Sequence, residues 1–108
     1  MLCAAMVVLG ALAAGAQDSL QVRLNASPRH QEWVKIPSGA RQVEAFIVYP
    51  EVAEKAQAVI VIHENRGLTD WVRGVADRLA EAGYIALAPD LLSGTGPGGG
   101  GTASFASQ

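Results

Sequence analysis

The chain has 108 residues, of which 50% are hydrophobic and 17% charged, and its formal net charge is -2 at pH 7. A chain of this length forms one domain at most. Because there is no basic excess, the composition excludes nucleic acid and anionic membrane surfaces as partners held by charge. It favours a small neutral or uncharged partner.

Residues 1–16 have the apolar composition of a secretory signal peptide. We expect cleavage near Ala16, because Ala14-Gly15-Ala16 matches the small-residue cleavage pattern and a polar stretch follows at Gln17. The segment lacks the positively charged N-terminal region that signal peptides usually have. The alternative to a signal peptide is a buried N-terminal helix. The signal predicts a secreted or periplasmic protein. Its mature part would have no disulfide, because the only cysteine is Cys3.

An antiparallel hairpin is expected next. Trp33–Ile36 and Val43–Tyr49 have the β-branched and aromatic content of short strands, and Pro37-Ser38-Gly39 between them is a turn signal. The preceding residues 20–29 are polar, show no periodic pattern and are expected to be irregular.

A strand–helix–strand unit is expected after the hairpin. The apolar run Ala58–Ile62 predicts a strand buried on both faces, and Tyr84–Ala88 predicts the next strand, parallel to it. A helix between them is expected to begin at Thr69 or Asp70 and to end at Gly83. Its predicted apolar face consists of Trp71, Val72, Val75, Ala76, Leu79 and Ala80. The fold class is therefore α/β, with an antiparallel hairpin leading into a parallel βαβ sheet.

The last part of the chain loses its apolar pattern. Residues 93–108 are rich in Gly, Ser, Thr and Ala and are expected to form a Gly-rich loop or a disordered tail. Gly94–Gly99 formally matches the dinucleotide-binding fingerprint, but Pro97 and further glycines stand where a helix should open. We therefore expect no nucleotide cofactor there.

The most informative residues end the first buried strand. Glu64 follows His63 there, at the kind of strand end where α/β enzymes keep their chemistry, and a carboxylate is costly to place there unless it is used. A zinc-protease motif is excluded because Gly67 takes the place of its second histidine, and no metal is expected. His63 is expected to be structural. Arg66 either pairs with Glu64 or faces water.

No complete catalytic triad can be assembled from these residues. None of the candidate serines Ser38, Ser93 and Ser104 lies in a Gly-x-Ser-x-Gly elbow. Asp90 follows Pro89 at a strand end and is expected to be a turn or cap residue rather than a catalyst.

Three segments together resemble the dienelactone hydrolase family of the α/β-hydrolase superfamily. They are Ile62–Leu68, Asp77–Ala80 and Gly83–Leu92, whose sequences are IHENRGL, DRLA and GYIALAPDLL. The resemblance implies the N-terminal half of an α/β-hydrolase fold over residues 17–92. Members hydrolyse esters or lactones through a covalent acyl-enzyme, without a metal or organic cofactor.

The resemblance also implies roles for two residues. Glu64 matches a carboxylate that helps to activate the nucleophile, and the backbone N–H of Asn65 would donate to the oxyanion. The nucleophile, His base and Asp of the family would lie beyond Gln108, so the chain alone is expected to be inactive. The strand Tyr84–Ala88 is expected to leave an apolar edge open. The sequence does not specify the oligomeric state.

Two other functions remain open on the sequence. One is a different α/β-hydrolase, such as a peptidase or a polyester esterase. The other is a non-catalytic secreted α/β module that binds a partner through the loop 63–68.

Overall fold

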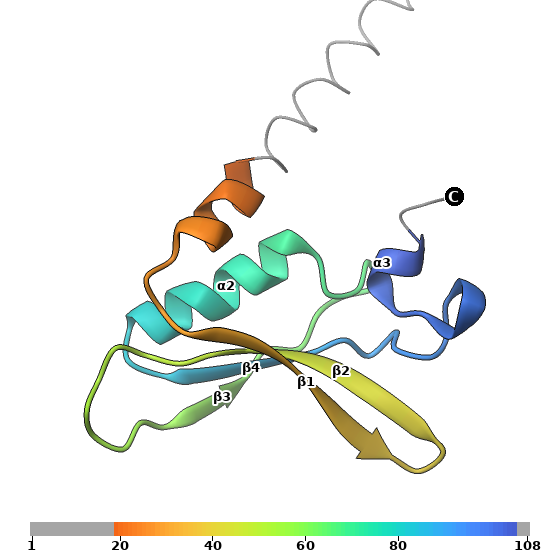
Figure 1. The fold of residues 1–108 in the computed structure, drawn as a ribbon, viewed down its shortest axis with the longest axis horizontal. Helices are drawn as coiled ribbons and strands as arrows, with labels where there is room; N and C mark the ends of the chain where they lie inside the picture. Colours follow the sequence, from red (N-terminus) through yellow and green to blue (C-terminus); the bar gives the residue numbers. More distant parts are fainter. Residues whose placement is uncertain (1–18, 106–108) are drawn as a thin grey trace, which may run out of the picture.

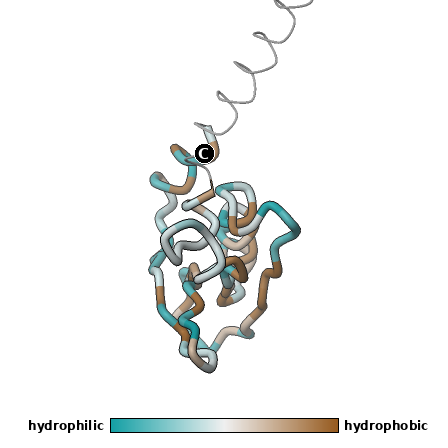
Figure 2. The backbone as a smooth tube through the Cα atoms, turned by 90° about the vertical axis from the view of Figure 1, so that its right-hand side faces the viewer, coloured by the Kyte–Doolittle hydropathy of each residue, from teal (hydrophilic) through white to brown (hydrophobic). Residues whose placement is uncertain are grey.

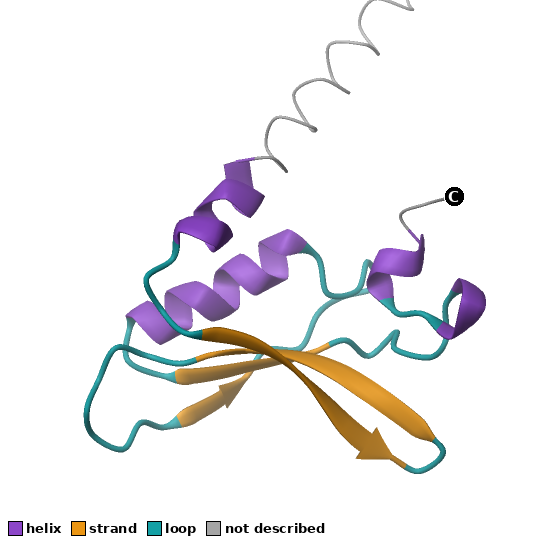
Figure 3. Ribbon diagram, in the orientation of Figure 1, coloured by secondary structure: helices purple, strands orange, loops and turns teal. Residues whose placement is uncertain are grey.

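The structure, a computed structural model, describes residues 19–105 and consists of one four-stranded sheet with its helices on one face (Figures 1 and 3). The predicted signal peptide and its cleavage site lie outside the described residues. None of the helices in this described range has the length and apolar character needed to cross a membrane. The elements are β1 (Gln31–Ser38), β2 (Arg41–Val48), β3 (Ala58–Ile60), α2 (Asp70–Glu81), β4 (Ile85–Pro89), the 3-10 helix η1 (Pro97–Gly99) and α3 (Thr102–Phe105).

The predicted hairpin is present and is longer than the sequence indicated. β1 and β2 pair antiparallel over their whole lengths, with Trp33 opposite Phe46. Gly39 opens the connecting turn at a positive φ of 60°, a conformation that glycine adopts without steric cost. Pro37 lies within β1, which is an outer strand, so its missing N–H costs no sheet hydrogen bond.

The predicted strand–helix–strand unit is also confirmed. β3 and β4 pair in parallel, and α2 connects them. Thr69 stands at the N-cap position with extended backbone, although its side chain makes no capping hydrogen bond. At the other end Gly83, at φ 103°, donates its N–H to Ala80 O, and Tyr84 donates to Leu79 O. This pair of bonds is the Schellman ending that Gly83 predicts.

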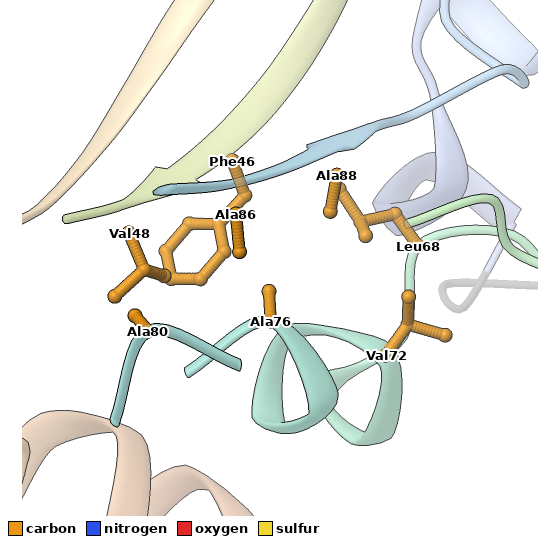
Figure 4. Packing of buried hydrophobic residues seen from close by; sticks show 8 residues of the cluster. All are labelled: Phe46, Val48, Leu68, Val72, Ala76, Ala80, Ala86 and Ala88. Carbon is orange, nitrogen blue, oxygen red and sulfur yellow. The ribbon is translucent and has the colours of Figure 1, made fainter. Parts of the chain in front are cut away.

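Small side chains bring α2 close to the sheet (Figure 4). Ala86 and Ala88 of β4 face Ala76 and Ala80 of α2, and all four are buried. Phe46 of β2 fills the wider space beside them and supplies the largest fully buried side chain. Because alanine keeps the backbones near each other, much of the core is formed by main chain and methyl groups rather than by large side chains. The other members of the cluster are Val48, Leu68 and Val72.

The prediction that Ala58–Ile62 is buried on both faces was wrong. β3 is the outer strand of the sheet order β1-β2-β4-β3, and Ile60 and Ile62 are 62% and 72% exposed. Figure 2 shows this hydrophobic run passing directly into the hydrophilic residues of the next loop. The open apolar edge therefore belongs to β3. It was predicted for Tyr84–Ala88, but β4 is paired on both sides.

The prediction that Trp71 belongs to the buried apolar face of the helix was also wrong. Trp71 is 62% exposed, whereas Val72, Ala76 and Ala80 are buried. The sheet contacts a narrow stripe of α2 because β4 presents only alanines to it. Val75 and Leu79, at the sides of this stripe, are half-buried.

The segment 20–29, expected to be irregular, contains a helix over residues 19–26. Its connection to β1 is fixed by Asp77 of α2. Asp77 accepts hydrogen bonds from Ser27 Oγ at 2.6 Å, from Gln31 Nε2 at 3.3 Å and from both ends of the Arg29 guanidinium at 3.1 and 2.7 Å. Burial acts to raise the pKa of Asp77, but the hydrogen bonds from Arg29 and Ser27 outweigh it and hold the pKa below the ordinary value.

The described residues 93–105 of the segment predicted to be a Gly-rich loop or disordered tail form a series of turns. They contain a tight turn, η1 and the single-turn helix α3. Polar side chains hold these turns together, and polar anchors leave no hydrophobic period in the sequence.

We expect Asp77→Asn to weaken the acid sensitivity of folding. The depressed pKa stabilises the fold above the unfolded carboxyl value of 3.8, and this stabilisation is lost as pH falls through the folded pKa. Urea unfolding between about pH 2 and pH 7 should give a shallower loss of unfolding free energy for the variant. Glu54→Gln, at an exposed carboxylate, is the control and should keep the wild-type slope. An unchanged slope in Asp77→Asn would assign the acid sensitivity to other carboxylates.

Candidate active-site loop

The loop 63–68 lies beyond the carboxyl end of β3, beside the carboxyl end of β4. Gly67 N–H donates to Glu64 O at 3.1 Å and closes a tight turn whose central residues are Asn65 and Arg66. Glu64, Asn65 and Arg66 are exposed, whereas Gly67 and Leu68 are buried. The loop therefore has a fixed base and an open tip.

Gly67 is required at the base for two reasons. Its φ of 84° is one that side chains rarely adopt, and a Cβ there would collide with the side chains of Thr102 and Leu92. The close approach lets Leu68 N–H donate to Thr102 Oγ1 at 2.8 Å. Gly67 thus brings the loop into direct contact with the start of α3.

His63 connects the loop to the end of β4. Its side chain is only 4% exposed, and its two ring nitrogens contact two backbone groups. Nδ1 lies 2.6 Å from Glu64 O, and Nε2 accepts the N–H of Leu91 at 2.9 Å. These contacts agree with the predicted structural histidine.

Asp90 holds the residues that follow β4. It is 5% exposed, and its carboxylate accepts from Leu92 N–H at 3.1 Å, Thr102 N–H at 2.8 Å and Thr102 Oγ1 at 2.7 Å. Its backbone carbonyl accepts from Ser93 Oγ at 2.5 Å, and Ser93 Oγ in turn accepts the N–H of Glu44 in β2. Asp90 is therefore the turn and cap residue that the sequence predicted. Ser93, one of the candidate serines, is a buried structural contact.

The structure places the two predicted site residues together at the tip. Glu64 makes no ion pair within the described part of the chain, so the predicted alternative in which Arg66 faces water is the one observed. Asn65 N–H has no acceptor among residues 19–105. An exposed carboxylate and a free backbone N–H are thus adjacent at the carboxyl end of a parallel strand pair.

Residues 19–105 contain no group of three or more His, Cys, Asp or Glu side chains placed to hold an ion. The tip of the loop has a carboxylate and a backbone N–H, which suit acid–base and oxyanion chemistry.

The family model described as the dienelactone hydrolase family matches residues 43–106, more than half of the chain. The chain belongs to the dienelactone hydrolase family. The matched region includes the loop 63–68, α2, β4 and the Asp90 contacts. The predicted family resemblance and the partial α/β-hydrolase fold are confirmed.

Individual relatives agree with the family match. The chain is 51% identical over 61 residues to "Putative hydrolase fragment YghX" of Escherichia coli, covering 56% of this chain and 52% of that protein. It is 46% identical over 56 residues to "Putative carboxymethylenebutenolidase" of Saccharolobus solfataricus, covering 52% of this chain and 21% of the relative. The chain thus spans about half of the first relative and about a fifth of the second.

A solved structure gives the same result. The crystal structure of a "Putative Dienelactone Hydrolase" from Klebsiella pneumoniae aligns with a TM-score of 0.55 and 32% identity. The alignment covers 59% of this chain and 27% of that structure. The fold described above therefore corresponds to one part of a larger hydrolase architecture.

The sequence analysis missed the role of Thr102. Its hydroxyl accepts from Leu68 N–H and donates to the Asp90 carboxylate, so it joins the loop to the end of β4. A threonine in a glycine-rich segment gives no periodic signal. The only available indication was that Thr102 follows several glycines directly, as a helix-starting residue does.

We expect Asp90→Asn to destabilise the fold by about 1–3 kcal/mol, because an amide cannot accept hydrogen bonds at both oxygen positions and a buried N–H loses its partner. Urea unfolding measures the loss, and amide exchange should be faster at Leu92 and Thr102. Glu54→Gln is again the matched exposed control. Equal stability of the two variants would contradict the role given to Asp90.

Proposed function

We propose that this chain supplies the oxyanion loop and the activating carboxylate of an ester or lactone hydrolase that works through a covalent acyl-enzyme. The observation that carries the proposal is the tip of the loop 63–68. There the Glu64 carboxylate and the Asn65 N–H are both unpartnered in the described structure, on a base fixed by Gly67. Family membership supports the reaction class.

In the proposed reaction a Cys or Ser nucleophile, supplied by polypeptide outside the described residues, attacks the carbonyl carbon of the substrate. The carbonyl π electrons move onto oxygen, and Asn65 N–H donates to the resulting oxyanion. The proton of the nucleophile passes to the His base, and collapse of the intermediate then breaks the carbon–oxygen bond while this proton moves to the leaving oxygen. An ester loses an alcohol in this step, whereas an opened lactone keeps its new hydroxyl on the acyl group. Water then cleaves the acyl-enzyme and releases the acid.

Glu64 acts in this scheme through the nucleophile. A carboxylate beside a thiol or hydroxyl accepts its proton or orients it, and so increases the fraction ready for attack. The exposure of Glu64 in the described chain leaves both oxygens available for this contact. The reaction needs no metal or organic cofactor at this site.

The substrate class follows from the family and the charge balance. Five relatives bear the name "Putative carboxymethylenebutenolidase", and one of Bradyrhizobium is named a probable lactonase. The net charge of -2 provides no strong field for a polyanionic substrate. A small ester or lactone is therefore the substrate we propose for this chain.

The test uses the protein purified from its own source through a tag inserted at the chromosomal gene, so that the complete native polypeptide or complex is assayed. Hydrolysis of p-nitrophenyl acetate and of a dienelactone is followed with wild type and with Glu64→Gln. We expect Glu64→Gln to reduce kcat about 100-fold with little change in KM, because the carboxylate acts on the nucleophile rather than on substrate binding.

Glu54→Gln, an exposed carboxylate remote from the loop, should retain wild-type kcat and KM. Hydrolysis that is equally fast in Glu64→Gln and wild type would remove Glu64 from the mechanism. Absence of ester and lactone hydrolysis by the native protein would refute the proposed function.

We also propose that the protein is exported, on the basis of the composition of residues 1–16. Mass spectrometry of the tagged protein from the periplasm or medium should give an N-terminus at Gln17. Ala14→Gln should leave an uncleaved precursor, because the position three residues before the cut requires a small side chain. Gln17→Asn lies after the cut and should be processed normally. A cytoplasmic protein that begins at Met1 would refute export.

A further inference from the structure

The ring of His63 is held in one tautomer by its backbone contacts. Leu91 N–H is a donor, so Nε2, 2.9 Å away, accepts and carries no proton. A neutral imidazole has one donor and one acceptor, so the proton lies on Nδ1. Nδ1–H therefore donates to Glu64 O, which lies 2.6 Å away.

A carboxylate does not supply this orientation. The closest approach of Asp90 to the ring is 3.9 Å, from Oδ1 to Nε2, which is too long for a hydrogen bond. Oδ1 already accepts from Leu92 and Thr102. His63 is thus oriented by the main chain at the end of β4, unlike a triad histidine, whose ring is oriented by an acid.

The Glu64 carbonyl is fixed from two sides. It accepts from His63 Nδ1 and from Gly67 N–H at 3.1 Å. A peptide unit is planar, and in the trans form its C=O and N–H point in opposite directions. Fixing Glu64 O toward the base of the loop therefore directs Asn65 N–H away from the base, where it has no acceptor in the described residues.

We infer that His63 is a positioning residue for the oxyanion donor: its Nδ1–H locks the Glu64–Asn65 peptide so that Asn65 N–H faces the reacting carbonyl. The inference rests on the proposed function. His63 touches neither substrate nor nucleophile in this role. It acts through one peptide plane, and its hydrogen bond to Leu91 ties that plane to β4.

Two substitutions separate the two hydrogen bonds of the ring. His63→Asn places an amide nitrogen near the position of Nδ1, so the donor to Glu64 O is kept and the acceptor for Leu91 is lost. His63→Gln places an amide oxygen near the position of Nε2, so the acceptor for Leu91 is kept and the donor is lost. His30→Gln, at an exposed histidine remote from the loop, is the control.

The first measurement is independent of catalysis and uses the 108-residue chain. Long-range ¹H–¹⁵N correlation spectra should show His63 protonated at Nδ1. The Asn65 amide resonance and its exchange rate should stay near wild type in His63→Asn and change in His63→Gln. Protonation at Nε2, or an Asn65 amide that is unmoved in His63→Gln, would overturn the inference.

The second measurement uses the native hydrolase. We expect kcat to fall about 10- to 100-fold in His63→Gln with KM within about twofold, and to recover largely in His63→Asn, since a misplaced oxyanion donor affects the transition state more than the substrate. Equal losses in the two variants would mean that the ring only supports the fold, and would overturn the inference while the proposed function stands. A native protein without hydrolase activity would refute both the proposed function and the positioning role of His63 in it. The spectra would then report only how His63 holds the Glu64–Asn65 peptide.

Discussion

The burial of the Asp90 carboxylate is the constraint on which this end of the molecule depends. A buried charge is stable only when its oxygens are hydrogen-bonded, and here the donors come from Leu92 and Thr102. To bring Thr102 back to Asp90, the chain after β4 must turn sharply, and its glycines allow this. The turn, η1 and α3 are therefore organised around one side chain.

The same cluster extends to the candidate active-site loop. Thr102 accepts the N–H of Leu68, and Leu91, next to Asp90, donates to His63. Both ends of the loop are thus attached to residues that follow β4. An oxyanion donor is effective when it is oriented before the reaction, because no reorganisation is then needed in the transition state. In the proposed function, the fixed base of the loop would provide this preorganisation, and the exposed tip would leave room for a substrate.

Local sequence patterns predicted the strands and the helix α2, but they did not show which of these elements pack beside one another. The hairpin, α2 and its Gly83 ending follow from turn, capping and periodicity signals within a few residues. The burial of Ala58–Ile62 depended on whether β3 lies inside the sheet, and a run of β-branched residues does not contain that information. The role of Trp71 depended on the small size of the β4 alanines. The proposed roles of Glu64 and Asn65 come from the family resemblance and stay predictions, whereas the link through Thr102 required the folded chain.

The steric requirement for glycine at position 67 means that the residues of the loop 63–68 do not tolerate substitution equally. No other residue fits at 67 without displacing Thr102 and Leu92, so mutation there disturbs the whole end of the sheet. The side chains of Asn65 and Arg66 project from the tip and contribute no hydrogen bonds within residues 19–105. Their identity can vary without cost to folding, and Asn65 would contribute its backbone N–H whatever its side chain. Under the proposed function, the loop could therefore acquire new substrate preferences at its tip while the backbone that carries the proposed oxyanion donor stays the same.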